Sequence, residues 1–114
     1  MKTLDHANLT DPERRCVQEV AEVLKAELPI TRIVLFGSKA RGTARSDSDI
    51  DLLVLTSRPV GPQLRREVSS RLFDISLQTD IPLSAVVASE HDWSEGVIRH
   101  LLIHSEVERD GCEV

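Results

Sequence analysis

Three short apolar runs, alternating with longer segments of helical periodicity, constrain the fold of this chain more than any other feature. The runs are ITRIVLF at 30–36, DIDLLVLT at 49–56 and LSAVVAS at 83–89. Each is long enough for a buried strand and too short for a helix. Apolar residues recur at helical spacing over residues 9–29, 62–79 and 93–111. This alternation predicts an α/β (α+β) fold, in which helices pack against a small mixed β-sheet.

The expected order is helix, strand, polar loop with a short helical turn, strand, helix, strand and helix. In the first helix, Asp11 is a candidate N-cap, Pro12 suits the first helical position, and Pro29 ends the helix. The sequence leaves open whether the first two strands run parallel or antiparallel. Residues 112–114 could add a short final strand. We expect residues 1–114 to form one domain, given the length of the chain.

Composition and charge narrow the class of partner. The net charge of −5 argues against a general nucleic-acid binder, which needs a basic face, and the 3% aromatic content leaves few rings for stacking bases. The sequence has no apolar signal segment and no run near the ~20 residues that cross a bilayer. We therefore expect a cytoplasmic protein, not bound to membranes, with reduced thiols at Cys16 and Cys112.

The stretch FGSKARGTARSDSDIDLLVL, residues 36–55, has no explanation in core packing. Asp49 and Asp51 are two apart on a predicted strand, so their side chains share one face, with Cα atoms about 6.5–7 Å apart. Two carboxylates at this spacing can bind one hard cation or a close pair. Mg²⁺ suits such a site, because it takes oxygen ligands and completes its shell with water and substrate phosphates.

The other end of the stretch has the residue types that bind phosphate. Gly37 allows close approach of the backbone, and exposed amides at a turn into a helix favour an anion. The Ser38 hydroxyl can donate to a phosphate oxygen, and Lys39, Arg41 and Arg45 add positive charge. Phosphate ligands at one strand end and metal ligands at the next predict a site for a nucleoside triphosphate bridged by Mg²⁺.

Each half of this stretch also has a purely structural interpretation. Gly-Ser after a strand is most often only a turn, and Asp-x-Asp opening a strand is often a solvated edge. Their occurrence together, at consecutive strand ends, favours a site. A P-loop is excluded, because Thr43 and Ala44 stand where its Lys and Ser/Thr are required.

The same stretch resembles the signature of the DNA polymerase β-like nucleotidyltransferases: Gly-Ser, a spacer, then Asp-hydrophobic-Asp. Its Ala-Arg-Gly and Ser-Asp-Ser-Asp segments are similar to the minimal nucleotidyltransferase (MNT) domains, and so is the closing EVERDGCEV. The resemblance covers most of the chain and implies the nucleotidyltransferase fold. It implies Gly37 and Ser38 at the nucleotide phosphates, with Asp49 and Asp51 as metal ligands and catalytic residues.

The implied reaction transfers a nucleoside monophosphate from a triphosphate, ATP or another NTP, to a hydroxyl, with Mg²⁺ or Mn²⁺ as cofactor. The implied partner is a helical HEPN toxin, which some MNT antitoxins adenylylate. A homo-oligomer remains open. Active members carry a third carboxylate on the next strand, and here the aligned residue is Ser84, a poor metal ligand and a poor base. This departure motivates an alternative to the enzyme, an antitoxin that binds nucleotide and acts by complex formation without turnover. A third reading, transfer to a small molecule such as an aminoglycoside, usually needs a further substrate-binding domain.

Four other residues invite a functional reading. His100 and His104 have a zinc-compatible spacing, but no third ligand is evident, so a partly exposed helix face is the better interpretation. Trp93 is interpreted as a packing residue. Asp80 has the strand parity of Ser84 but is interpreted as a helix-end or turn residue.

Overall fold

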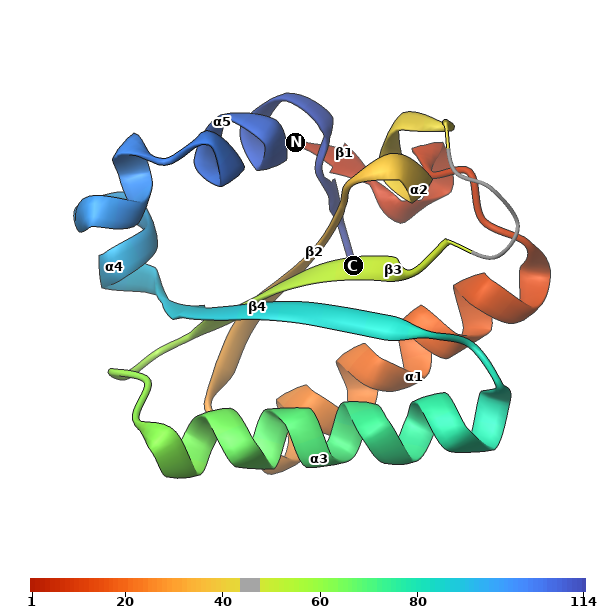
Figure 1. Ribbon diagram of the computed structural model, residues 1–114, viewed down its shortest axis with the longest axis horizontal. Coiled ribbons are helices and arrows are strands. Elements are labelled where there is room, and N and C mark those ends of the chain that lie inside the picture. Colours follow the sequence, from red (N-terminus) through yellow and green to blue (C-terminus); the bar gives the residue numbers. More distant parts are fainter. Residues whose placement is uncertain (44–47) are drawn as a thin grey trace.

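A computed structural model, which describes residues 1–43 and 48–114, shows a five-stranded mixed sheet with helices on both faces (Figure 1). This architecture confirms the predicted fold class. In chain order the elements are β1 (Lys2–Thr3), the 3₁₀ helix η1 (Leu4–His6), α1 (Asp11–Glu27), β2 (Ile30–Phe36), α2 (Ser38–Arg41), β3 (Ile50–Thr56), α3 (Pro62–Thr79), β4 (Leu83–Ser89), α4 (Glu90–Ser94), the 3₁₀ helix η2 (Val97–His100), α5 (Leu102–Asp110) and β5 (Cys112–Glu113).

The strands lie in the order β1-β5-β2-β3-β4. Strands β2 and β3 pair antiparallel, which settles the question that the sequence left open, and β3 pairs parallel with β4. The short final strand is confirmed as β5, which lies between β1 and β2. Strand β1 and η1, of two and three residues, were not predicted.

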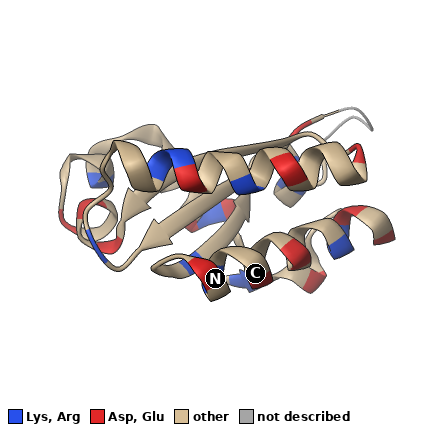
Figure 2. Cartoon of the chain, turned by 90° about the horizontal axis from the view of Figure 1, so that it is seen from below, with Lys and Arg blue, Asp and Glu red and all other residues tan. Residues whose placement is uncertain are grey.

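Helices α1 and α3 cover one face of the sheet and enclose the larger core (Figure 1). Alternate residues of β3 point into this core, and Ile50, Leu52 and Val54 are fully buried there. Figure 2 shows α1 and α3 in front of the sheet, with acidic and basic residues mixed along them. None of the helices in the described part of the chain is long and apolar enough to cross a membrane.

The opposite face carries a smaller core under α4, η2 and α5, formed by Val34, Leu53, Leu55, Ala88, Trp93 and Val107. The prediction of a single last helix over residues 93–111 is wrong. The backbone is extended at Gly96 and Leu101, and these two breaks separate α4, η2 and α5. Trp93, Ile98 and Ile103 are five apart, so on one continuous helix they would point in widely different directions. The two breaks let them all pack against the same face of the sheet.

The start of α1 also differs from the prediction. Thr10, not Asp11, is the N-cap, and its hydroxyl accepts a hydrogen bond from the Glu13 amide at 3.2 Å. The Glu13 carboxylate accepts in return from the Thr10 amide at 2.9 Å, which completes a capping box. These two hydrogen bonds give partners to two backbone amides that would otherwise have none within the helix. The helix therefore begins one residue after Thr10.

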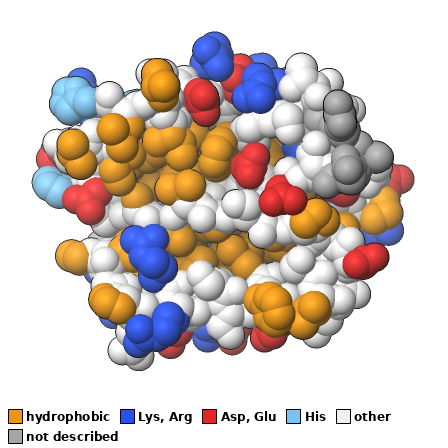
Figure 3. Space-filling view, viewed as in Figure 1, with side chains coloured by type: hydrophobic (Ala, Val, Ile, Leu, Met, Phe, Trp, Pro, Cys, Tyr) orange, Lys and Arg blue, Asp and Glu red, His pale blue; other side chains and the backbone are white. Residues whose placement is uncertain are grey.

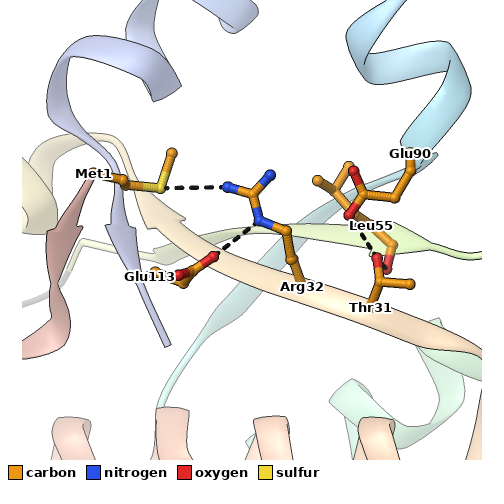
Figure 4. Close-up of polar contacts among 6 residues, drawn as sticks. All are labelled: Met1, Thr31, Arg32, Leu55, Glu90 and Glu113. Carbon is orange, nitrogen blue, oxygen red and sulfur yellow. Dashed lines mark hydrogen bonds and ion pairs between the residues drawn. The ribbon is translucent and has the colours of Figure 1, made fainter.

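Side chains of β2 make polar contacts with neighbouring segments (Figure 4). Arg32 donates to the carboxylate of Glu113 on β5 at 2.9 Å, and Thr31 donates to that of Glu90 at the start of α4 at 2.7 Å. Arg32 also contacts the sulfur of Met1. These contacts stabilise the arrangement of β5 and α4 around the central strands.

Candidate functional site

The helices on the second face leave part of the sheet open, and Asp51 lies on this open part. Asp51 shares its side of β3 with Leu53 and Leu55, which α4 and α5 cover, but the carboxylate itself is only half-buried. Asp49 immediately precedes the strand and is exposed. Figure 3, in the view of Figure 1, shows hydrophobic side chains gathered on the side of α4 and α5, with acidic side chains at the surface near them. The two carboxylates are therefore accessible to a ligand.

Gly37 lies directly against Asp51. The strand register pairs Phe36 with Asp51, so the chain leaves β2 beside the carboxylate. Gly37 has φ +78°, a conformation that favours glycine, and a Cβ at this position would collide with the Asp51 carboxylate. The structure thus brings together the two halves of the predicted site, the Gly-Ser turn and the Asp-x-Asp segment.

The electrostatics of this corner suit a cation. Burial and the neighbouring charge of Asp49 raise the pKa of Asp51, while Arg41 acts in the opposite direction. Two adjacent carboxylates repel one another, and a bound cation would relieve that repulsion. Their oxygens are the hard donors that Mg²⁺ prefers. By donor chemistry and charge, the residues present fit a divalent metal.

The remaining predicted phosphate ligands lie on or near α2. Ser38 is the first residue of α2 and is half-buried, and Arg41 is exposed. Lys39 is buried, and its ammonium forms an ion pair with Glu13 of α1, with 2.7 Å between Nζ and Oε2. Arg45 lies outside the described residues.

Ser84 stands opposite Asp51 in the register of β3 and β4, so the position aligned with a third carboxylate lies beside the acid pair. The described residues contain no group of three or more His, Cys, Asp or Glu side chains able to hold a metal. Asp80 caps the end of α3 with φ 58°, which confirms its interpretation as a helix-end residue.

The other candidates have structural surroundings. Trp93 is buried, which confirms its packing role, and it stacks on His104 with ring centroids 4.6 Å apart. His100 belongs to η2 and His104 to α5, so the two histidines do not share one helix.

One residue next to the candidate site was missed. Glu13 is far from the polar stretch in sequence, yet it bonds Lys39, the residue after Ser38. The signal was present as Thr-Asp-Pro-Glu, the spacing of a capping box, but a capping box predicts only where a helix begins.

Comparisons with known proteins bear on this geometry. A family model described as "Nucleotidyltransferase domain" matches residues 17–104. The chain is 30% identical over 97 residues to the Methanocaldococcus jannaschii protein named "Putative protein adenylyltransferase MJ0141", a match that covers 85% of this chain and 89% of that protein.

Two solved structures share the fold. A chain of a toxin–antitoxin complex with AMP-PNP superposes with a TM-score of 0.59 at 20% identity, over 91% of this chain and 72% of that chain. A chain from the complex of a tri-AMPylated Shewanella oneidensis HEPN toxin with its MNT antitoxin gives a TM-score of 0.56 at 18% identity, over 88% and 69% of the two chains.

Proposed function

The chain belongs to the nucleotidyltransferase domain family, and from this premise we propose that it binds Mg²⁺-ATP at the corner between β2 and β3 and transfers AMP to a hydroxyl group of a protein. The observation that carries the proposal is the contact between Gly37 and Asp51. This contact joins a backbone suited to phosphate with a carboxylate pair suited to a metal.

The proposed roles follow from the positions of the side chains. Asp49 and Asp51 would hold Mg²⁺, which when bound would supply charge neutralisation for the triphosphate. The Gly37 backbone and the Ser38 hydroxyl would bind phosphate oxygens. Arg41, whose charge already acts on Asp51, would add positive charge at the same corner.

In the proposed reaction, the acceptor hydroxyl oxygen forms a bond to the α-phosphorus of ATP. The bond from that phosphorus to the bridging oxygen breaks, pyrophosphate leaves with the electron pair, and the hydroxyl proton passes to water. The name of the M. jannaschii relative and the tri-AMPylated toxin of the S. oneidensis complex support AMP as the transferred group and a protein as the acceptor. A HEPN protein is the partner that we propose.

A second candidate function is binding without turnover, in which the protein neutralises its partner by forming a complex. One observation favours it: Ser84, not an acid, lies opposite Asp51. A serine cannot take up the acceptor proton at neutral pH as a carboxylate can.

Calorimetric titration with ATP in the presence of Mg²⁺ tests the site. We expect the wild-type protein to bind and the Asp49→Asn, Asp51→Asn double variant to lose binding. The matched control is Asp74→Asn, Asp92→Asn, which removes two exposed acids elsewhere and should bind as the wild type does. Absence of binding to the wild type, or equal binding to both double variants, would contradict the proposal.

Transfer is tested with ATP labelled on the α-phosphate and a HEPN protein from the same organism as acceptor. If Ser84 stands in place of a catalytic carboxylate, Ser84→Asp should raise the labelling rate on the order of 100-fold, within the usual range for general acid–base catalysis. Labelling that is absent in wild type, with ATP binding intact, would contradict transfer. Binding without turnover would then be supported by a stable complex in which the wild-type protein neutralises the HEPN protein.

A further inference from the structure

The buried ion pair between Lys39 and Glu13 suggests a role for a lysine that the sequence placed among the phosphate ligands. We propose that Lys39 is a positioning residue, which fixes the Gly37–Ser38 turn through Glu13 and does not itself bind the nucleotide. This inference rests on the proposed function, because it concerns how the same site is held in shape.

The ion pair is short and sequestered from solvent. The ammonium of Lys39 and the carboxylate of Glu13 are 2.7 Å apart, and the two side chains are 5% and 12% exposed. An ammonium this deeply buried needs a permanent partner, because charge without one is costly in the interior. Moving Lys39 to a phosphate would leave the Glu13 charge behind in a buried place.

Glu13 is held firmly in turn. One of its carboxylate oxygens accepts from the Thr10 amide in the capping box, and the other contacts Lys39. Glu13 lies in the first turn of α1, the 17-residue helix that covers the larger core. A hydrogen-bonded carboxylate on a long packed helix is a fixed point to which a short segment can be tied.

Helix α2 is such a segment. It has four residues, and a helix of this length has almost no stability of its own. Contacts with the chain before it hold it in place: the Lys39 carbonyl accepts from the Asn8 amide at 3.1 Å, and the Lys39 side chain reaches Glu13. Ser38 directly precedes this anchor, and Gly37 before it abuts Asp51.

The surroundings of Lys39 agree with this role. A cavity of about 230 Å³ is lined by Lys39, Glu13, Thr10, Ser48, Asp80 and Pro82 among others. The lining comes from the start of α1, the residues just before β3 and the link from α3 to β4. Lys39 therefore lies where these three segments meet. Asp51 is not among the residues that line this cavity.

A substitution at Glu13 separates the two possible roles of Lys39. Glu13→Gln keeps an oxygen for the Thr10 amide but removes the negative charge facing Lys39. If Lys39 bound phosphate directly, this change would leave its positive charge uncompensated and tighten ATP binding. If Lys39 positions the turn, the same change loosens the anchor and weakens binding.

The experiment is a double-mutant cycle of Glu13→Gln and Lys39→Met, with Mg²⁺-ATP and Mg²⁺-tripolyphosphate titrated by calorimetry. We expect each single variant to bind both ligands about tenfold more weakly, and the double variant to be no weaker than the weaker single variant, because one coupled pair is broken in all three. The loss should be equal for both ligands, since the turn serves the phosphates. Lys39→Arg, which keeps the charge, should recover most of the affinity.

Controls exclude a general loss of folding. The double variant leaves neither charge without its partner, and each variant is titrated well below its measured midpoint of thermal unfolding. The matched control is Glu27→Gln, Arg71→Met, which removes an ion pair from the far end of α1, with 3.7 Å between Arg71 Nε and the Glu27 carboxylate. We expect this control to bind ATP as the wild type does.

Three results would overturn the inference. Tighter binding by Glu13→Gln would make Lys39 a phosphate ligand, and unchanged binding by all Glu13 and Lys39 variants would make the ion pair purely structural. Both leave the proposed function intact, since the wild type still binds. A wild-type protein that binds neither ligand would overturn the proposed function and this inference with it.

Discussion

The two faces of strand β3 differ in a way that separates stability from function. On one face Ile50, Leu52 and Val54 are fully buried under α1 and α3. On the other, Leu53 and Leu55 are buried under α4 and α5, but Asp51 is only half-buried. The buried face anchors the strand along its length, so the strand can carry a charged residue on its other face. Substitutions on the two faces should therefore affect different properties.

Truncating a side chain on the fully buried face of β3 should have the largest effect on stability. Leu52→Ala removes a fully buried side chain and should lower the free energy of unfolding by about 3 kcal/mol, from lost burial and the cavity left behind. Urea denaturation followed by circular dichroism measures this. Below the unfolding transition the variant should still bind ATP, and selective loss of ATP binding without loss of stability would break the comparison.

The close approach of Gly37 to Asp51, on the other face, predicts the next largest effect on stability. Gly37→Ala combines a left-handed φ with a collision against Asp51, so we expect a loss of about 1–3 kcal/mol in unfolding free energy, together with weaker ATP binding. Gly61→Ala is the matched control, because Gly61 is extended and has no atom within 4 Å of an added Cβ. Equal effects from the two substitutions would remove the Gly37–Asp51 contact as the feature that unites the site.

Asp51→Asn should change stability in the opposite direction. The amide carries no charge, so it removes both the cost of burying a carboxylate and its repulsion by Asp49. In metal-free buffer at pH 7 we expect a rise of less than about 1 kcal/mol in unfolding free energy, within the usual range for substitutions outside the core. Thermal unfolding with a chelator present measures it. A clear loss of stability would mean that Asp51 supports the fold as well as the site.

The smallest effect concerns Glu13, an acidic residue of helix α1. Burial alone would raise the pKa of Glu13, but hydrogen bonds from Lys39 and Thr10 and the charge of Lys39 bring it below the ordinary value of 4.5. An acid whose pKa is lowered by folding stabilises the protein above its unfolded pKa, and that contribution is lost as the pH falls through the folded pKa. We therefore expect the unfolding free energy to fall below pH 4.5 more steeply in wild type than in Glu13→Gln. Parallel pH profiles from denaturant titrations would show that the ion pair contributes nothing to stability.

Much of the fold could be predicted because its main elements are long enough to show a period. The strands at Ile30–Phe36 and Leu83–Ser89 and the helix at Pro62–Thr79 have the predicted bounds. The division of the last helical segment could not be predicted, because its two breaks depend on what Trp93, Ile98 and Ile103 must contact on the sheet. Local pattern does not contain that information.

The candidate site was predictable in composition but not in contacts. Gly37, Ser38, Asp49 and Asp51 stand out from sequence because core packing does not explain them. The partner of Lys39 was not predictable, since Glu13 at the start of α1 meets Lys39 only in the folded chain. The sequence shows that positive residues cluster near the Gly-Ser turn. It does not show which of them form ion pairs within the protein.

The position of β5 has a consequence for the order in which the sheet assembles. Strand β5 pairs with β2 on one side and with β1 on the other, so the first strand of the chain has no place in the sheet until residues 112 and 113 have docked. Such a pairing between distant segments closes a long loop, which costs conformational entropy, so we expect it to form after the pairing of β2 with β3. The two buried thiols would then report on separate stages: we expect Cys16 on α1 to lose reactivity toward a thiol reagent before Cys112 on β5 does.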